Sequence, residues 1–360
     1  MSGPARAVER LWSGAGLAAR VGRALLTPAA GLYAAGVGMR NAAYRTGVLR
    51  SRAVAARTVS IGNVRVGGTG KTPLTRWLAE RIHARGVPVA ILTRGYGGSA
   101  RGAHVVGDGE RIAGDVARSG DEAVMLARTS AVPVVAGADR AAAAALAIAT
   151  FGSRILVCDD AFQHRALRRN LDLVLVDAGE RGGLARLLPA GPLREPLCAL
   201  KRADVVLIRE AGNEADPLPT PAFPGQRVLR VRFAPTVLMA PAAASWREIG
   251  LAALAGQRVL AVSAVARPAA LYEALRAWEV DLAHVLEYPD HHPYDVRDWH
   301  AIAAAAKDVD LIVTTEKDLV KLEVFPFARG KLVALRLGVE VEDGEALVTE
   351  AIGDVMTGAA

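Results

Sequence analysis

The fold of this chain is decided by the stretch Val59-Ser-Ile-Gly-Asn-Val-Arg-Val-Gly-Gly-Thr-Gly-Lys-Thr72. Its first residues favour a β-strand, glycines follow at positions 67, 68 and 70, and residues 74–82 have the apolar spacing of a helix. A strand, a glycine-rich loop, Lys-Thr and a helix is the order of a phosphate-binding loop. We therefore expect an α/β fold with a site for a nucleoside triphosphate.

Each residue type in this loop suits phosphate binding. Glycines let backbone N–H groups converge on phosphate oxygens, and the start of the next helix adds partial positive charge. We expect the Lys71 ammonium on the β- and γ-phosphates and the Thr72 hydroxyl on Mg²⁺. The nucleotide-binding residues are predicted to be Gly67, Gly68, Thr69, Gly70, Lys71 and Thr72.

One position departs from the full motif. Arg65 stands where the motif has its first glycine. The alternative interpretation is a glycine-rich turn that binds no ligand. The strand and helix patterns on either side of the loop favour the phosphate site.

Length and composition limit the class of protein. The 360 residues can form two domains, and 52% hydrophobic with 22% charged residues exclude disorder of the whole chain. The two cysteines, Cys158 and Cys198, provide no disulfide framework, which fits a reducing cytoplasm. A net charge of +7 favours an anionic partner: nucleic acid, phosphates or acidic lipid headgroups.

The positive charge is concentrated near the N-terminus. Residues 1–57 contain nine arginines against Glu9 alone, interleaved with leucine and aromatic side chains. We predict two basic amphipathic helices, separated near Thr27-Pro28, that lie on a membrane surface; an ordinary helical pair packed on the core is the alternative. The uncharged run 24–39 is shorter than the ~20 residues of a membrane span. The N-terminal region also differs from a signal peptide, because arginines interrupt its apolar part. No aromatic-studded sheet or recognition-helix pattern indicates a nucleic-acid surface.

Apolar runs after the loop predict a mostly parallel sheet. The expected strands lie within 86–98, 132–136, 155–160, 171–178 and 204–210, with a small hairpin over 105–113 and a helix over 140–150. Arg94 and Tyr96 lie in a glycine-rich turn after the first of these strands, where strand ends converge. Asp121 and Glu122 begin a helix, a position that N-terminal capping alone could also explain.

The run 155–160 ends in two aspartates, as expected of a Walker B strand. An aspartate at this strand end can hold Mg²⁺ through water. Because adjacent strand residues point to opposite faces, Asp159 and Asp160 should do different work, and we assign the metal to Asp159. Gln163 and His164 follow at the same rim.

A stiff connector lies between two of the predicted strands. Residues 187–196 contain three prolines and carry Arg194 and Glu195. A rigid loop between buried strands is a better candidate for a binding site than for a spacer.

The second half of the chain predicts another α/β unit. Proline and polar residues at 211–225 indicate a domain boundary. Short linker strands are expected at 228–233 and 236–240, further strands at 258–262 and 310–318, and helices at 269–278 and 297–306. The predicted parts are basic amphipathic helices in 1–50, a P-loop domain in 51–225 and a C-terminal α/β domain in 226–360.

The second unit contains the cluster Asp290-His291-His292. A histidine polarised by a carboxylate suits proton transfer. A metal site would be a weak interpretation, because adjacent histidines without a cysteine or an i,i+4 partner form a poor ligand set. A surface turn without chemistry is the other alternative.

Together these motifs resemble the tetraacyldisaccharide 4'-kinase family of lipid A biosynthesis. The resemblance runs nearly end to end, through seven motifs in the family's order: 62–73, 93–98, 120–122, 159–164, 188–196, 289–292 and 314–318. Ala161, where the family usually has glycine, is a departure that concerns local backbone shape.

The resemblance implies an ATP- and Mg²⁺-dependent kinase that phosphorylates the 4'-hydroxyl of a tetraacyl glucosamine disaccharide 1-phosphate. It implies a P-loop NTPase-like, mostly parallel sheet with a second, smaller α/β domain. The protein would bind the cytoplasmic face of the bacterial inner membrane peripherally and meet its acylated lipid substrate there. No nucleic acid and no obligate protein partner are expected.

The family also pairs the aspartate of its Gly-Asp-Glu motif with a histidine of its Asp-His-His motif. Carried over, the catalytic residues are Asp121 and His291, with His292 as the open alternative, beside Lys71. Contacts with substrate or phosphate are expected from Arg94, Asp160, Gln163, His164, Arg194 and Glu195. Whether Glu195 contacts metal, nucleotide or sugar stays open.

Two other classes of protein compete with a kinase. A membrane-bound switch ATPase of the partitioning type also has Gly-Gly-x-Gly-Lys-Thr, but its signature lysine precedes the glycine pair, where this chain has Val66. A basic membrane-adhering protein with a vestigial loop would bind no ATP.

Overall fold

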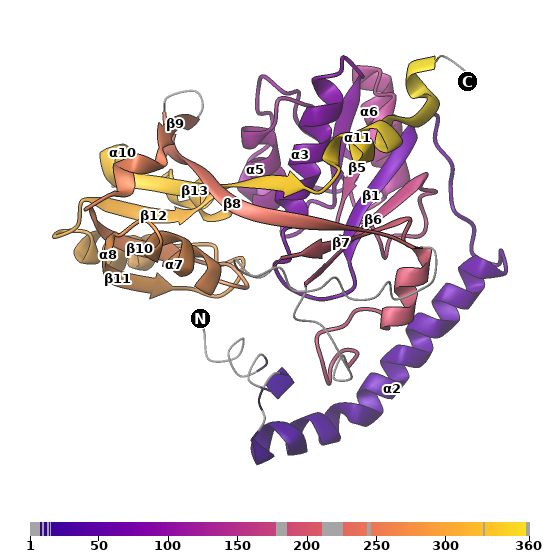
Figure 1. Ribbon diagram of the computed structural model, residues 1–360, viewed down its shortest axis with the longest axis horizontal. Coiled ribbons are helices and arrows are strands. Elements are labelled where there is room, and N and C mark those ends of the chain that lie inside the picture. Colours follow the sequence, from indigo (N-terminus) through magenta and orange to yellow (C-terminus); the bar gives the residue numbers. More distant parts are fainter. Residues whose placement is uncertain are drawn as a thin grey trace.

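The computed structural model describes residues 8, 11, 12, 14, 16–177, 186–210, 226–242, 246–326 and 328–357. Its strands form a 13-stranded sheet that runs through two lobes (Figure 1). The strand order is β11-β10-β12-β13-β8-β7-β6-β1-β5-β2-β4-β3, and β9 pairs with β8 beside this path.

The first lobe contains the predicted parallel strands. They are β1 (Arg57–Asn63), β2 (Val89–Thr93), β3 (His104–Gly107), β4 (Val134–Ala136), β5 (Ile155–Asp159), β6 (Leu171–Asp177) and β7 (Val205–Arg209). β1 pairs in parallel with both β5 and β6, and only the short edge strand β3 runs antiparallel to its neighbour among these seven described strands. The predicted mixed α/β fold with a mostly parallel sheet is confirmed.

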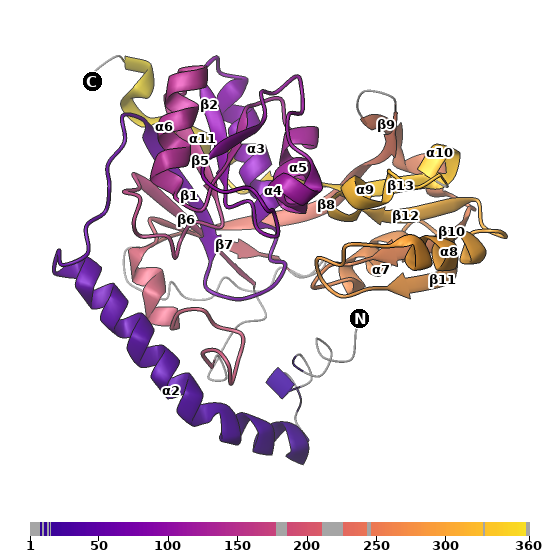
Figure 2. The same cartoon turned by 180° about the vertical axis from the view of Figure 1, so that it is seen from behind.

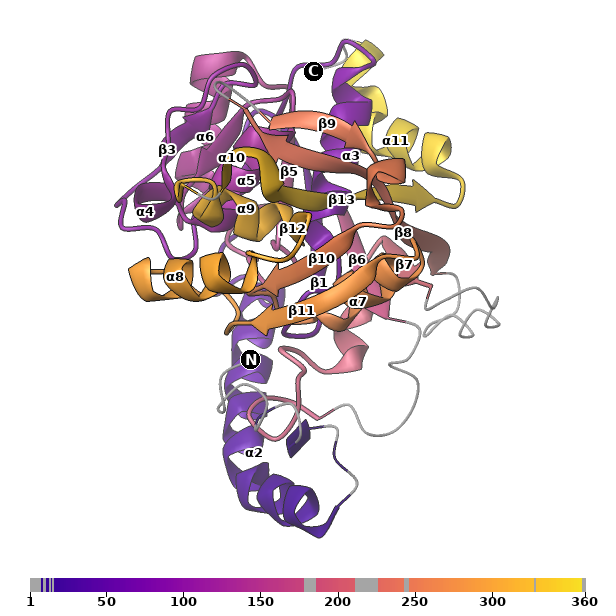
Figure 3. The ribbon, with the colours of Figure 1, turned by 90° about the vertical axis from the view of Figure 1, so that its left-hand side faces the viewer.

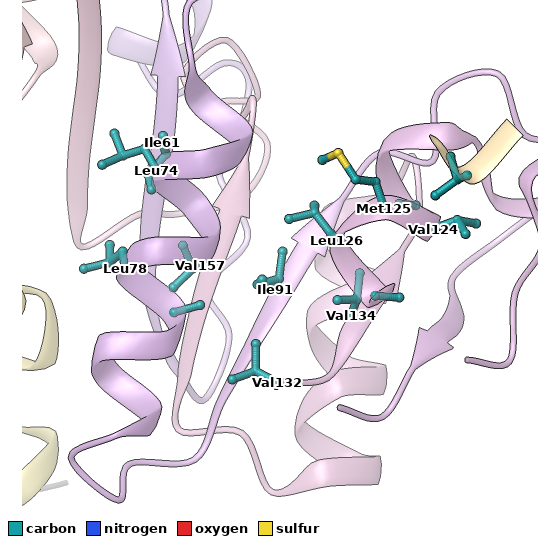
Figure 4. Packing of buried hydrophobic residues seen from close by; sticks show 14 of the residues in the cluster. Ile61, Leu74, Leu78, Ile91, Val124, Met125, Leu126, Val132, Val134 and Val157 are labelled. Carbon is teal, nitrogen blue, oxygen red and sulfur yellow. The ribbon is translucent and has the colours of Figure 1, made fainter. Parts of the chain in front are cut away.

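Helices cover both faces of this part of the sheet. They are α3 (Lys71–His83), α4 (Val116–Ser119), α5 (Asp121–Thr129), α6 (Arg140–Phe151) and α11 (Gly344–Ile352), with the 3-10 turns η2 (Leu197–Arg202) and η4 (Gly353–Thr357). Ile91 of β2 packs in the cluster of α3 and α5, whereas its neighbour Leu92 packs with α6. Figure 4 shows Ile91 facing the side of the sheet on which Leu78 of α3 and Leu126 of α5 lie. Burial on both faces explains why these strands are continuous apolar runs.

A long strand connects the lobes. The two linker strands predicted at 228–233 and 236–240 are instead one strand, β8 (Arg227–Pro241). Its first residues pair in parallel with β7, and its remainder pairs antiparallel with β13 (Leu332–Val341), as Figure 2 shows from behind. Pro235 lies beside a register shift in the β8–β13 ladder, and such an irregularity accommodates a residue without an N–H.

The second lobe is built around β10. Its strands are β9 (Trp246–Gly250), β10 (Arg258–Ser263), β11 (Asp281–Glu287) and β12 (Leu311–Thr315), and its helices are α7 (Ala269–Arg276), α8 (Val296–Ala305), α9 (Glu316–Leu322) and α10 (Ala328–Lys331), with the turn η3 (Leu251–Leu254). The strand predicted over 310–318 was too long. It ends at Thr315, whose hydroxyl accepts a hydrogen bond from the Asp318 amide and caps α9.

The N-terminal region differs from the prediction of two helices. Residues Leu17–Arg45 form one helix, α2, that includes Pro28. Every residue of α2 is at least partly exposed, and Figure 3 shows the helix projecting from the body of the protein, so it is not a helical pair packed on the core. Among the described residues, the structure contains no helix with the length and apolar character needed to cross a bilayer.

The predicted division into 1–50, 51–225 and 226–360 stays a prediction. β8 and β13 both extend along the junction of the two lobes. The proposed boundary at 211–225 lies outside the described residues.

Candidate active site

The predicted phosphate-binding loop lies between β1 and α3, which begins at Lys71. Asn63 Nδ2 donates a hydrogen bond to the buried Thr69 hydroxyl at 2.9 Å and fixes the loop to the end of β1. Gly70 has φ +97°, and a Cβ at this position would lie 2.6 Å from the Phe233 ring of β8. The left-handed backbone and the close ring both require glycine here.

Arg65, the departure from the full motif, has a structural explanation. Its backbone forms an antiparallel bridge with Leu193. The Val66 amide donates to the Pro192 carbonyl at 2.9 Å, and the Arg194 amide donates to the Val64 carbonyl at 2.8 Å. The segment that precedes the glycines therefore binds the proline-rich connector and brings Arg194 to the loop.

Asp159 lies where a P-loop protein holds its metal. Its carboxylate accepts hydrogen bonds from Thr72 Oγ1 at 3.3 Å and from Thr75 Oγ1 at 2.9 Å. Burial and the negative charges of Glu122 and Asp160 outweigh the Lys71 ammonium and raise the pKa of Asp159 to about 7. A buried carboxylate whose charge Lys71 does not fully balance, next to a hydroxyl, fits Mg²⁺, which prefers oxygen ligands. Thr72 and Asp159 are thus the residues able to hold the ion.

Asp160 has different partners from Asp159. Its φ of +47° takes the chain out of the strand. Arg194 Nη1 donates to both of its carboxylate oxygens, at 2.9 and 2.8 Å, and Lys71 Nζ lies 3.7 Å from Oδ1. Burial raises the pKa of Asp160, but these two cations hold it below its ordinary value. Two of the three cations predicted to meet phosphate, Lys71 and Arg194, are therefore gathered at one carboxylate.

The sequence-predicted pair of Asp121 and His291 comes together across the lobes. His291 Nδ1 lies 3.1 Å from each carboxylate oxygen of Asp121. Asp121 begins α5 after Gly120, where a Cβ would lie 2.1 Å from the Tyr96 carbonyl oxygen. This close approach packs the turn that carries Tyr96 against the start of α5, and the Tyr96 ring meets His291 edge-on at 5.3 Å between centroids.

The charges around this pair define its ionisation. Burial raises the pKa of Asp121, but the hydrogen bond from His291 and the ammonium groups of Lys317 and Lys321 lower it to about 2. Burial and Lys317 lower the pKa of His291, but Asp121 and Asp290 outweigh them, so this pKa lies above its ordinary value. Asp121 is therefore a carboxylate at neutral pH.

The neighbouring histidine has a different environment. His292 Nε2 lies 2.7 Å from Asp298 Oδ2, and its ring stacks on Tyr288 at 4.9 Å between centroids. Asp298 also closes the capping box that begins α8. Of the two candidates left open by the sequence, His291 is the one that contacts Asp121.

Two lysines beside the pair were missed by the sequence reasoning. Lys317 Nζ lies 2.9 Å from His291 Nε2, and Lys321 Nζ lies 3.4 Å from Asp121 Oδ2. The signal for Lys317 was present in the motif 314–318, which the family resemblance included without a role. That motif was expected on a strand, whereas Lys317 and Lys321 both lie on α9, one helical turn apart.

The remaining rim residues, Arg94, Gln163 and His164, have different surroundings. Arg94 is exposed just after β2, and Gln163 Nε2 donates to the Asn63 carbonyl at 2.8 Å. Burial and the nearby charges of Arg140 and Arg169 lower the pKa of His164 to about 4, so its ring is neutral at pH 7. Arg140, which the sequence reasoning did not select, donates to the Asp159 carbonyl at 3.2 Å.

Glu195 contacts the N-terminal helix. Its fully buried carboxylate accepts hydrogen bonds from Asn41 Nδ2 at 2.8 Å and Arg202 Nη2 at 3.0 Å. The Tyr33 hydroxyl of α2 also donates to the Arg194 carbonyl at 2.9 Å. These contacts favour an anchoring role for Glu195 over the predicted contact with metal, nucleotide or sugar.

Comparison with known proteins gives consistent matches. A family model described as tetraacyldisaccharide-1-P 4'-kinase matches residues 22–356. The tetraacyldisaccharide 4'-kinase of Anaeromyxobacter sp. (strain Fw109-5) is 40% identical over 368 residues, covering 97% of this chain and 98% of the relative. The tetraacyldisaccharide 4'-kinase of Geobacter metallireducens is 38% identical over 323 residues, covering 88% of this chain and 94% of the relative. A crystal structure of LpxK from Aquifex aeolicus in complex with ATP is similar with a TM-score of 0.77 at 28% identity, covering 91% of this chain and 98% of that one.

Proposed function

The chain belongs to the tetraacyldisaccharide-1-P 4'-kinase family, and from this premise we propose how its residues carry out the family's reaction. It is a kinase that transfers the γ-phosphate of ATP to the 4'-hydroxyl of a tetraacyldisaccharide 1-phosphate in lipid A biosynthesis. The observation that carries the proposed mechanism is the Asp121–His291 pair, beside the Asp159 strand end and the phosphate-binding loop.

The loop and the start of α3 form the nucleotide side of the site. Backbone N–H groups of residues 67–72 and the Lys71 ammonium would contact the phosphates of bound ATP, and Thr72 with Asp159 would hold Mg²⁺. Mg²⁺, when bound, neutralises charge on the β- and γ-phosphates. Binding of phosphate gives Lys71 a second anionic partner beside Asp160, which the described geometry places 3.7 Å away.

Asp121 forms the acceptor side. Phosphoryl transfer depends mostly on positioning and charge neutralisation, so an acceptor hydroxyl must be held in line with the phosphate. The Asp121 carboxylate orients the 4'-hydroxyl and takes its proton, and the His291 N–H holds that carboxylate in place. A pKa of about 2 makes Asp121 a weak base, so orientation precedes a late proton transfer. Such assistance contributes ~10²–10⁴-fold to the rate.

Cationic and polar groups at the rim complete the site. Arg94 and Arg194 neutralise phosphate charge on the substrate or during transfer. Asp160, which pairs with both Lys71 and Arg194, holds these cations at the loop until phosphate arrives. Gln163 and His164 provide uncharged hydrogen-bonding groups at the same rim.

The helix α2 is the proposed membrane contact. Its largest exposed apolar side chains recur four or seven positions apart, which places them on one face of the helix: Leu17, Val21, Leu25, Leu32 and Met39. A basic helix with an exposed apolar face lies in the interface of an anionic membrane. We place it on the cytoplasmic face of the inner membrane, where the acyl chains stay in the bilayer.

The contacts of α2 support this placement. Tyr33 and Asn41 attach the helix to the backbone of Arg194 and to Glu195, in the connector that also meets the phosphate-binding loop. A membrane at α2 is therefore close to the reacting groups, and the sugar headgroup alone has to reach them. That no obligate protein partner takes part stays a prediction.

A direct assay distinguishes this function from its competitors. The purified protein is incubated with γ-labelled ATP and a tetraacyldisaccharide 1-phosphate in detergent micelles, with Lys71→Ala as the control. Label on the 4'-position that requires Lys71 supports the kinase. ATP hydrolysis without label on the sugar would favour the switch ATPase, and an absence of ATP binding would favour the vestigial loop.

A further inference from the structure

We propose that Lys317 is a positioning residue for the catalytic pair: its ammonium donates a hydrogen bond to Nε2 of His291 and fixes the neutral tautomer that carries its proton on Nδ1. The inference deepens the proposed function and rests on it, because it assumes that Asp121 and His291 act on the sugar hydroxyl.

The contacts on the two ring nitrogens allow one neutral tautomer. An ionised carboxylate only accepts hydrogen bonds, so His291 Nδ1, 3.1 Å from both oxygens of Asp121, must carry a proton. An ammonium group only donates, so His291 Nε2, 2.9 Å from Lys317 Nζ, must accept. A proton on Nε2 would point at a cation.

Lys317 is held in this position by two carboxylates. Its Nζ lies 3.1 Å from Asp290 Oδ1 and 3.4 Å from Glu122 Oε1. The ammonium thus donates hydrogen bonds to Asp290 and to His291 Nε2 and forms an ion pair with Glu122. Burial lowers the pKa of Lys317, but Glu122, Asp290 and Asp121 outweigh it and raise the pKa above its ordinary value. Lys317 stays a cation throughout the physiological range.

Three elements beside His291 contribute charge to this arrangement. α5 supplies Asp121 and Glu122, α9 supplies Lys317 and Lys321, and the histidine's own turn supplies Asp290. The only described ring that meets the imidazole is the uncharged Tyr96. The imidazole therefore has one cation in direct contact, Lys317, and three carboxylates nearby, those of Asp121, Glu122 and Asp290.

Removal of Lys317 should favour the imidazolium. Nε2 lies 3.9 Å from Glu122 Oε1 and 3.9 Å from Asp290 Oδ1, and a protonated Nε2 could then donate to either. An imidazolium binds the Asp121 carboxylate more strongly than a neutral ring does, which weakens Asp121 as an acceptor for the sugar proton. Lys317 thus keeps Asp121 reactive, although it acts through His291.

The tautomer can be read directly by NMR. Full-length protein labelled with ¹⁵N-histidine in detergent is titrated between about pH 5.5 and pH 9.5, with His291→Gln to assign the resonances. We expect the wild type to show the tautomer protonated on Nδ1 once the ring is neutral. Lys317→Met should raise the pKa of His291 by about one unit, because a contacting cation has been removed. Lys317→Arg should restore most of the wild-type value, and Lys307→Met, which removes an exposed lysine after α8, should change nothing.

The pH profile of 4'-phosphorylation gives the second readout. The acidic limb of kcat/KM in Lys317→Met should move to higher pH by about one unit, with activity recovered at high pH. A wild-type ring protonated on Nε2 when neutral, or a Lys317→Met protein with an unchanged pKa for His291, overturns this inference even if Asp121→Ala is inactive. Full activity of Asp121→Ala would instead overturn the proposed function, whatever the spectrum of His291 shows.

Discussion

Arg76 of α3 and Glu316 of α9 form a buried ion pair, with Arg76 Nη1 lying 3.1 Å from both carboxylate oxygens. Arg336 Nε donates to the same carboxylate at 2.6 Å. Arg76 follows the Lys71-Thr72 pair on the same helix, and Glu316 directly precedes Lys317. The pair therefore joins α3, which begins at Lys71, to α9, which carries Lys317.

Loss of the Glu316 carboxylate should lower the stability of the protein strongly. In Glu316→Ala, the guanidinium groups of Arg76 and Arg336 would be left close together without their shared counter-ion, and we expect the free energy of unfolding to fall by about 3–5 kcal/mol. Urea denaturation measures this. The matched control is Glu345→Ala, which removes an exposed carboxylate paired with Arg81 and should cost less than about 1 kcal/mol. Similar losses in both variants would contradict a special role for the buried pair.

The phosphate-binding loop should tolerate alanine at one glycine and not at another. Gly70→Ala places a Cβ at φ +97° and against the Phe233 ring, so we expect a loss of about 1–3 kcal/mol in unfolding free energy and weaker ATP binding. A Cβ at Gly68 would point into open space, with no atom beyond its chain neighbours within 4 Å, so Gly68→Ala should leave stability within about 0.5 kcal/mol. Thermal and urea unfolding of the two variants compare them. Equal stability would show that residue 70 does not hold the described backbone.

The ionisation of Asp121 should give a defined pH dependence. Its pKa is lowered from 3.8 to about 2, so the stabilisation it provides is complete above pH 4 and is lost as the pH falls from about 4 to about 2. Asp121→Asn should therefore be less stable than the wild type by about 2 kcal/mol at pH 6, and this difference should shrink toward pH 2. Urea unfolding of both proteins across this pH range measures how the stability difference changes with pH. A difference that does not change with pH would mean that Asp121 is not stabilised as a carboxylate.

Local sequence patterns could predict much of the site but not its tertiary contacts. The strand–loop–helix order located Lys71 and Thr72, and the apolar run before Asp159 located the proposed metal ligand, because both signals lie within one βα unit. Pro28 indicated a helix break that the structure does not have, since a proline costs a helix one hydrogen bond without always ending it. The contact of Asn41 with Glu195 joins positions 154 residues apart, which no local pattern reports.

The start of α9 was missed for a different reason. The apolar run 311–313 indicated a strand, and the prediction carried it on to Asp318. Thr315 with Asp318 three residues later is the spacing of a helix N-cap, and giving that signal priority would have placed Lys317 on a helix. Even then its contact with His291 depends on how β10, β12 and the turn at 289–292 pack.

The apolar face of α2 should determine membrane binding. Replacing both Leu25 and Leu32, which are 77% and 78% exposed, by glutamate should lower binding to vesicles containing phosphatidylglycerol at least tenfold. Activity on substrate in detergent micelles should change much less. The control is Val324→Glu, an equally exposed apolar residue of the second lobe, 74% exposed, which should leave vesicle binding unchanged. Sedimentation with vesicles measures this binding. An equal loss of vesicle binding in Val324→Glu would exclude α2 as the specific membrane contact.

In the proposed mechanism Asp121, held by His291, acts on the sugar hydroxyl. The most direct measurement is the single-turnover rate of 4'-phosphorylation by Asp121→Ala, His291→Ala and, as the matched control, His292→Ala, each with its ATP affinity. We predict that the first two lose ~10²–10⁴-fold in rate while binding ATP normally, and that His292→Ala keeps most of its activity. Rates near wild type for Asp121→Ala and His291→Ala would contradict the account.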